Sequence, residues 1–152
     1  MSYILRTIQN PAHRAQLFDR FERLDPTTPA LWGRLTAPRM LAHLCDQMRM
    51  PYNEKPSPPI PGVQRYPVMQ QLVLYLLPWP KARIPGPAEA FQTPPAAWSD
   101  DLATLKSLVD QFVSAAPARP WAVHPNFGPM NHRVWGYFSY RHFDHHLCQF
   151  GA

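Results

Sequence analysis

The chain has 152 residues and a mass of 17.5 kDa, a length that predicts one domain over residues 1–152 with one hydrophobic core. Hydrophobic residues make up 45% of the chain and charged residues 16%, which excludes a disordered chain although 20 residues are proline. The prolines are therefore expected to punctuate folded elements.

The formal net charge is +5, and the basic residues are scattered along the chain instead of gathered in a run. Specific nucleic-acid binding needs a clustered basic stripe, so we expect no specific nucleic-acid partner. A mildly basic surface favours an anionic small ligand or simply aids solubility. We expect a small-molecule substrate, and leave open whether the chain forms a homodimer.

Two cysteines, Cys45 and Cys148, and an N-terminus without the apolar stretch of a secretory signal predict a reduced, cytoplasmic protein. The longest apolar stretch, residues 68–79, is interrupted by Gln70, Gln71 and Pro78 and is shorter than the ~20 residues that span a bilayer. No membrane association is expected.

Cap signals mark the starts of the first two predicted helices. Asn10 before Pro11 predicts a helix over residues 11–24, and Thr36 before Ala37-Pro38 predicts a second over residues 37–50. Each carries apolar residues at spacings of three and four, so each has one buried stripe.

The rest of the chain alternates long irregular segments with three more helices. A proline-rich loop over residues 51–67 leads into a short helix over 68–77, and an irregular segment over 80–95 precedes a helix over 99–116. Asn131 can cap a last helix over 131–150, and a short strand over 2–7 is the one β element considered. These elements predict an all-α protein, an antiparallel four-helix bundle with long proline-rich connections and an extra short helix.

Histidines cluster near the C-terminus, where three of the seven lie within five residues. His142 and His146 are one helical turn apart and share the apolar stripe, so their rings can converge on one metal ion. A third ligand must come from another element, and His43 in the apolar second helix is the candidate. The competing interpretation is that these are hydrogen-bonded core histidines, as His residues on apolar faces often are. His13 and His132 lie near helix starts and are expected to be exposed.

The segments WGRLTAPRMLAHLCDQ at 32–47, HPNFG at 124–128 and WGYFSYRHFDHHLCQFG at 135–151 resemble the DinB/YfiT-like superfamily of four-helix bundles, which are described as metal-dependent enzymes. The resemblance implies that His43, His142 and His146 are the metal ligands and that Gln149 is the glutamine that trails the pair. Many members have Arg-Gly between the last His and this Gln, whereas this chain has Leu147-Cys148, so a contact from that arginine is not expected.

Three neutral imidazoles with an open position are typical of a catalytic site, in which a divalent metal lowers the pKa of bound water. Zn is the default ion for such ligands, with Ni, Fe(II) or Mn as alternatives. The resemblance implies a thiol S-transferase that uses a low-molecular-weight thiol, or a metal-assisted hydrolase. Two alternatives are a non-enzymatic bundle that binds a metal or small ligand, and an interaction protein that recruits a partner through residues 51–67.

No convincing general base stands out in the sequence, and Asp46 and His145 are the weak catalytic candidates, with His124 near the cavity mouth. Gln47 and Gln149 are candidates for supporting the ligands. Cys45 and Cys148 are two residues from proposed ligands, so they point away from the site and are taken as packing residues, with a regulatory disulfide as the alternative. Four aromatic residues are candidate pocket walls: Trp32, Phe127, Trp135 and Tyr137.

Overall fold

The computed structural model describes residues 5–81 and 86–152, and the described residues form helices and no β-strand. The four long helices are α1 (Pro11–Arg23), α2 (Ala37–Arg49), α4 (Trp98–Ser114) and α5 (His132–Gln149). Shorter elements connect them: α3 (Pro67–Gln71), the 3-10 helices η1 (Met50–Tyr52), η2 (Val63–Arg65) and η4 (Ala88–Phe91), and the π-helical η3 (Leu72–Leu76). The all-α prediction is confirmed for these residues.

Three of the four long helices begin at side-chain caps that the sequence predicts. Asn10 accepts hydrogen bonds from the backbone N–H groups of Ala12 and His13, and Thr36 accepts one from Arg39. Asn131 accepts one from Val134. Each cap pairs backbone donors that the first helical turn would otherwise leave without partners, so it fixes where the helix starts.

The predicted helix ends agree with the structure to within two residues for the long helices, but α4 lacks the side-chain cap of the other three and the predicted short helix differs. Helix α4 begins at Trp98 without a side-chain cap, and Asp101 instead accepts a hydrogen bond from the N–H of Ala96. The predicted helix over 68–77 is an α-helical turn followed by the π-helical η3, which ends before Leu77 and Pro78. Of the strand considered over 2–7, residues 2–4 lie outside the described residues and 5–7 are not a strand.

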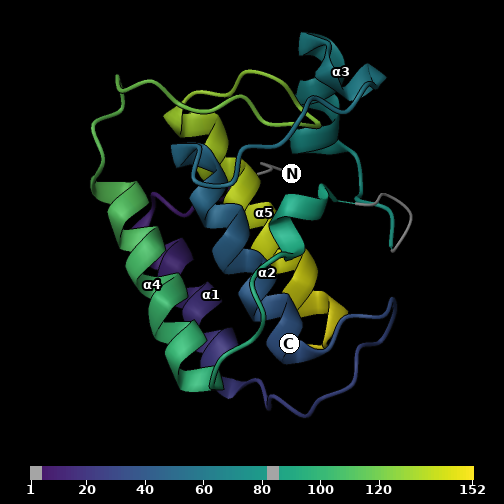
Figure 1. The fold of residues 1–152 in the computed structure, drawn as a ribbon, viewed down its shortest axis with the longest axis vertical. Helices are drawn as coiled ribbons and strands as arrows, with labels where there is room; N and C mark the ends of the chain where they lie inside the picture. The colour runs from purple at the N-terminus through teal and green to yellow at the C-terminus, as the bar shows by residue number, and fades with distance from the viewer. Residues whose placement is uncertain (1–4, 82–85) are drawn as a thin grey trace.

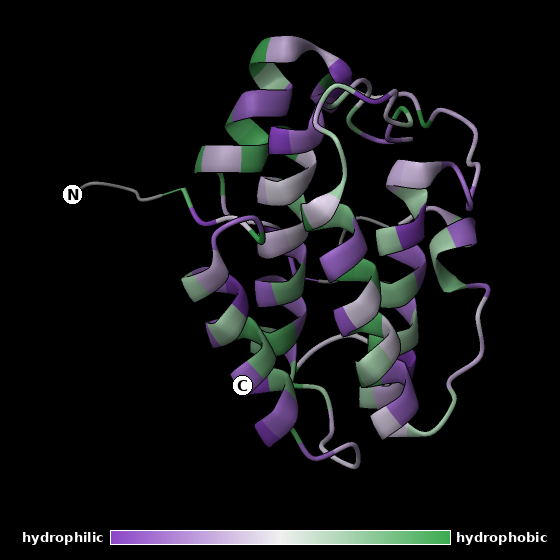
Figure 2. Cartoon of the chain, turned by 90° about the vertical axis from the view of Figure 1, so that its left-hand side faces the viewer, coloured by the Kyte–Doolittle hydropathy of each residue, from purple (hydrophilic) through white to green (hydrophobic). Residues whose placement is uncertain are grey.

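One cluster of buried apolar side chains joins the long helices. Helix α2 packs against α4, η4 and α5, and α1 packs against α5 (Figure 1). Each long helix carries both hydrophobic and hydrophilic residues (Figure 2), as a helix with one apolar stripe does. Fully buried members of the cluster come from all four: Leu17, Phe21, Leu41, Leu44, Leu105, Phe112, Phe143 and Leu147. No helix among the described residues is long and apolar enough to cross a membrane.

The proline-rich segment 51–67 packs against the loop that precedes α5. Ile60 donates its N–H to the carbonyl of Pro125, and the Arg65 guanidinium also donates to that carbonyl. Gln70 follows with hydrogen bonds to the carbonyls of Phe127 and Pro129. The segment is therefore held against the loop that precedes α5, although several of its prolines are exposed.

The expectation that His13 and His132 are exposed is wrong. His132 is buried, with Nε2 at 2.8 Å from the Phe112 carbonyl and Nδ1 at 3.1 Å from the Gln9 side-chain amide, and its ring stacks on Trp121. His13 is half-buried because its Nδ1 accepts the N–H of Thr7. The N-terminal segment folds back over the start of α5, which sequence position near a cap does not reveal.

This fold-back generates a prediction at Gly136, whose carbonyl accepts the N–H of Ile8. A Cβ on Gly136 would lie 2.7 Å from both Thr7 Oγ1 and Gln9 Oε1. Gly136→Ala ought to gain up to ~1 kcal/mol of helix propensity. We expect the overpacking cost of about 1–3 kcal/mol to outweigh this gain, giving a net loss of about 1 kcal/mol in urea unfolding. Thr7→Ala should restore part of the loss in the double variant, whereas a net gain in stability would show that segment 7–9 moves aside freely.

Candidate metal centre

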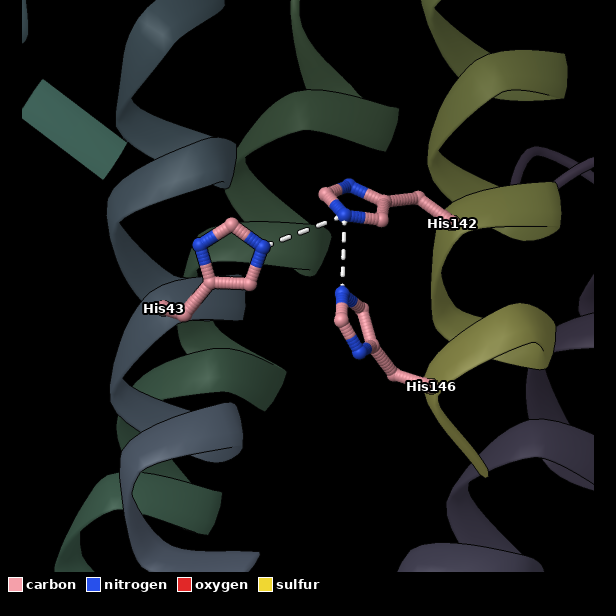
Figure 3. Close-up of side chains that lie close together, drawn as sticks. All are labelled: His43, His142 and His146. Atoms are coloured by element: carbon pink, nitrogen blue, oxygen red, sulfur yellow. Dashed lines mark hydrogen bonds between the residues drawn. The ribbon is translucent and has the colours of Figure 1, made fainter. Parts of the chain in front are cut away.

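Three histidines from two helices point their Nε2 atoms at one another (Figure 3). His43 lies in the middle of α2, and His142 and His146 lie one turn apart on α5. His142 Nε2 is 3.1 Å from His43 Nε2 and 3.1 Å from His146 Nε2. One potential ligand atom from each residue falls within 4.8 Å of the other two, so the group could hold a metal ion.

The 3-10 helix η4 fixes the orientation of His43. The Nδ1 atom of His43 is 2.7 Å from the carbonyl oxygen of Ala90, and the Phe91 ring stacks on the imidazole with centroids 4.1 Å apart. A carbonyl only accepts, so Nδ1 carries the proton and the lone pair of Nε2 faces the other two histidines. Metal-binding histidines in proteins are commonly held by this kind of second hydrogen bond.

Gln149 fixes the orientation of His146. Its Oε1 is 2.8 Å from His146 Nδ1, and its side-chain N–H donates to the Trp32 carbonyl at 2.8 Å. The carbonyl of Trp32 determines which end of the Gln149 amide faces the histidine, so Nδ1 of His146 also carries the proton. The lone pair of His146 Nε2 is then directed to the same point as that of His43.

These two orientations leave the three Nε2 atoms with at most one proton, which only His142 can carry. If His142 Nε2 is protonated, its one N–H donates to either His43 or His146 but not to both. The other ring nitrogen, His142 Nδ1, is then a buried acceptor, and it has no partner among the described residues. If His142 Nδ1 is protonated, three lone pairs face one another. A cation at the centre would satisfy all three lone pairs, which no arrangement of protons does.

Burial keeps these imidazoles neutral. Desolvation lowers the pKa of His43 to about 4, against the opposing effect of its hydrogen bond to Ala90. Desolvation, followed by the nearby His43, lowers the pKa of His146 to about 3, and desolvation with the neighbouring histidines lowers the pKa of His142. Neutral imidazole is the form that binds metal, so the site is in its binding form at neutral pH.

The spacing of the nitrogens fits a first-row divalent ion. At a metal–nitrogen distance of about 2.0–2.1 Å, two ligands of a tetrahedral site lie roughly 3.3–3.4 Å apart. The two 3.1 Å separations at His142 are close to that value, and the potential ligand atoms of the three residues all lie within 4.8 Å of one another.

A cavity of about 510 Å³ opens beside the three histidines. Several residues that the sequence singles out line it: Trp32, Gln47, His124, Phe127, His145 and Gln149. Gln47 lies one turn after His43 and donates to Ser139 Oγ, while His124 Nδ1 accepts the N–H groups of Asn126 and Phe127. The candidate ligands, their supports and the cavity therefore form one site.

Two aromatic candidates do not line this cavity. Trp135 is fully buried in the core, where it packs against His124 and Phe138. Tyr137 contacts Tyr75 and the Arg133 guanidinium on another face of α5. The angular position of an aromatic residue around the axis of α5 thus does not tell whether it lies in the core or in the cavity wall, because the core and the cavity face the same broad side of the helix.

Asp46 is buried and bound to other groups instead of facing the cavity. Its carboxylate accepts the N–H and the hydroxyl of Thr93 at 2.9 and 2.5 Å and pairs with Arg49 and Lys55. Burial would raise the pKa of Asp46, but the Thr93 hydrogen bonds and Lys55 outweigh it and lower that pKa. Asp46 therefore holds the chain just after η4, the element that orients His43.

Sequence reasoning missed the residues that the loops bring to the site. Trp79, Phe91 and Asn126 line the cavity, and Ala90 acts through its backbone carbonyl. Asn126 lies in the HPNFG turn, which was a detectable signal, whereas a backbone carbonyl in an aperiodic segment leaves none. Both cysteines are free: Cys45 donates to the Asp101 carbonyl, with a pKa raised by burial to about 12, and Cys148 is exposed.

Comparisons with known proteins do not identify the chain: no family model, no curated protein and no solved structure matches it. The resemblance to the DinB/YfiT-like superfamily stays a prediction, and the site has to be interpreted from its own geometry.

Buried neutral histidines predict acid unfolding of the metal-free protein. Desolvation lowers the pKa values of His43, His124 and His146 to about 3–4, whereas the unfolded chain binds these protons below about pH 6.5. Stability is therefore lost as pH falls below 6.5, at up to about 1.4 kcal/mol per pH unit for each residue. With a typical stability of about 5–15 kcal/mol, unfolding followed by circular dichroism in chelator should occur between about pH 3 and 5.

The control for this prediction is His124→Asn, because the Asn oxygen can still accept the N–H groups of Asn126 and Phe127 but does not titrate. The variant should take up about one proton fewer on unfolding, seen as a shallower fall of stability with pH. An unchanged slope would mean that His124 titrates normally in the folded protein.

The position of Asp46 predicts an effect on His43 through η4. Asp46→Asn removes the charge that holds Thr93 and should weaken metal binding by about tenfold, as the loss of a ligand's supporting contacts does. Asp101→Asn is the matched control, since Asp101 is also a buried carboxylate that accepts a backbone N–H but lies away from η4. Equal metal affinities of the two variants in a chelator competition would show that Asp46 stabilises the fold alone.

Proposed function

We propose that the chain is a metal-dependent enzyme that binds a divalent ion, Zn²⁺ by default, through His43, His142 and His146 and acts on a small molecule in the adjoining cavity. The observation that carries the proposal is the set of three neutral imidazoles with converging Nε2 atoms, two of them oriented by separate acceptors. A divalent ion held in this way is a Lewis acid with positions left for a substrate atom.

The cavity supports a catalytic interpretation over a purely structural one. Structural zinc sites are usually closed by four protein ligands, whereas this group has three and opens to a space of about 510 Å³. Among the described residues that line the space there is no carboxylate or cysteine to complete a closed site. The apolar cluster between the helices does not include the metal group, so the fold is expected to persist without the ion.

Two histidines of the cavity can move protons. His145 is half-buried and contacts the rings of Trp32 and His146, and His124 presents its Nε2 while Nδ1 accepts backbone N–H groups. Desolvation lowers the pKa of both, so each is a neutral base at pH 7. Of the two, we assign the base role to His145, because His124 already uses one nitrogen to hold its turn.

The reaction class follows from the superfamily resemblance: transfer of a low-molecular-weight thiol to an electrophile, or metal-assisted hydrolysis. In the first, the S–H proton passes to a base such as His145, a carbon–sulfur bond forms and the electrophile's leaving group departs with the bonding electrons. We place the long helices in an antiparallel DinB-type bundle and the protein in the reducing cytoplasm, where both free cysteines are stable. We propose a small-molecule substrate and no specific nucleic-acid partner.

The alternative is a non-enzymatic bundle that binds a metal or small ligand, and metal analysis alone does not separate it from an enzyme. Turnover does: the metal-loaded protein would be incubated with a panel of electrophiles and several thiols, and with activated esters. Metal-dependent product formation that His146→Ala abolishes supports an enzyme. Stoichiometric metal without turnover on either panel favours the binding protein.

The metal itself is tested by paired variants of neighbouring residues. His146→Ala should abolish stoichiometric metal in protein purified without a nickel column, because two ligands remain, while the helical circular-dichroism signal stays. His145→Ala is the matched control: it removes an adjacent imidazole of the same cavity that is not one of the three. Metal should stay bound to this control.

Chelation separates a catalytic ion from a structural one. We expect chelator to lower the melting temperature only because the free energy of metal binding no longer stabilises the folded state. The protein should stay folded at room temperature and neutral pH. Complete unfolding on chelation would make the ion structural, and metal retained by His146→Ala would place it elsewhere.

A further inference from the structure

The walls of the cavity beside the three histidines are mainly aromatic. Trp79 stacks with Phe127 at a centroid distance of 6.5 Å and contacts Phe138 at 5.7 Å, and Phe91 covers His43. Flat rings that face a space of about 510 Å³ are suited to a small molecule with a flat apolar body. These walls fix the shape of the ligand but not its charge.

The charge of the cavity is uniformly positive or neutral. Among the described residues that line it, Arg34 is the one charged side chain, and no aspartate or glutamate does. The Lys81 ammonium lies 4.5 Å from the centroid of the ring of Trp32, which lines the cavity as Arg34 does. Nearby carboxylates are engaged elsewhere, Asp46 with Thr93 and two cations and Asp144 with Arg20. Three neutral ligands add no negative charge to compensate a divalent ion.

Two buried ring nitrogens without a hydrogen-bond partner belong to residues that line the cavity. Trp32 Nε1 is buried without a hydrogen-bond partner, and indole offers a donor only. His142 Nδ1 is also buried without a partner, and it points away from His43 and His146 (Figure 3), so it is a donor whenever Nε2 faces an ion. The indole N–H is a fixed donor, and the His142 N–H is a second donor once an ion is bound. Oxygen atoms of an occupant would satisfy them, since the described lining residues include no carboxylate.

We infer that the ligand of this cavity is an organic anion with a flat apolar body, of which an aryl carboxylate is the simplest example. Its anionic oxygens lie at the end formed by Trp32, Arg34 and Lys81, and its body lies between Trp79, Phe127 and Phe138. The contribution of the metal ion's charge rests on the proposed function. The basic residues and the unpartnered indole N–H support the inference without a metal.

The neutral amides of the cavity do not oppose this assignment. Gln47 Oε1 and Asn126 Oδ1 are buried without partners, and each belongs to an amide that can present either an oxygen or an NH₂ group. These amides can therefore donate to a carbonyl or accept from a hydroxyl of a ligand. Charge selection is left to the basic end.

The test compares three probes of matched shape: phenylacetate, neutral phenylacetamide and cationic phenethylamine. Each is titrated by calorimetry or ligand-observed NMR into chelator-treated and Zn²⁺-loaded protein at about 1 mM probe, a range suited to small fragments. We expect phenylacetate to bind at least about tenfold more tightly than the amide in both forms, and the amine not to bind. The preference should be larger in the loaded form, because the ion adds positive charge.

Variants locate the anion. Arg34→Met keeps the aliphatic stem and Trp32→Phe keeps a ring, and each should weaken phenylacetate by about three- to tenfold while leaving phenylacetamide unchanged. Arg39→Met is the matched control, because Arg39 is an exposed arginine at the start of α2 that does not line the cavity. Melting temperatures of all three verify that they fold.

The outcomes separate the two proposals. A carboxylate preference in chelator-treated protein that depends on Arg34 and Trp32 supports the inference even if no metal binds, a result that would sink only the metal centre. Equal binding of phenylacetate and phenylacetamide, tighter binding of phenethylamine, or no binding of phenylacetate in either form overturns the inference and leaves the metal centre standing.

Discussion

The structure depends on one constraint: three imidazole Nε2 atoms from two helices are buried at a common point with at most one proton among them. His43 and His146 each give their proton to an acceptor outside the group, so neither can donate inward, and burial prevents the charged form. Such an arrangement costs free energy in the absence of a cation, because buried acceptors lose hydration without gaining partners. Its persistence in a packed core is the physical reason to regard the group as a metal centre and not as core histidines.

The constraint explains the roles of groups that look unrelated in sequence. Asp46 holds Thr93, Thr93 closes the segment that follows η4, and η4 supplies the Ala90 carbonyl to His43. On the other helix, Gln149 connects His146 to the Trp32 carbonyl, so the loop before α2 is coupled to the end of α5. Both chains of contacts end at a backbone carbonyl, which accepts but never donates, and so each sets the tautomer of a ligand as well as its position.

The sequence predicts the helices and the three ligands better than the rest of the site. Local sequence patterns indicate them: the caps at Asn10, Thr36 and Asn131, and the one-turn spacing of His142 and His146. Such patterns do not depend on residues distant in the sequence. His43 was found because it interrupts an apolar stripe. The same reasoning misplaced His132, Trp135 and Asp46, since whether a residue on an inward arc meets the core, the cavity or a loop depends on segments distant in sequence. Ala90 and Phe91 gave no signal, because their contributions are a carbonyl and a ring placed by an aperiodic loop.

The division between helices and loops also decides where the chemistry and the selectivity of the site reside. The candidate metal ligands stand on α2 and α5, whose packing brings three nitrogens close enough to hold one ion. The groups that would contact a substrate stand mostly on connections: Trp32 and Arg34 before α2, Trp79 after η3, and Asn126 and Phe127 before α5. Loops tolerate substitution that would destroy a helix core. The type of centre can therefore be argued from the helices, whereas the substrate has to be argued from the charge of the loops and from the unpartnered indole N–H of Trp32.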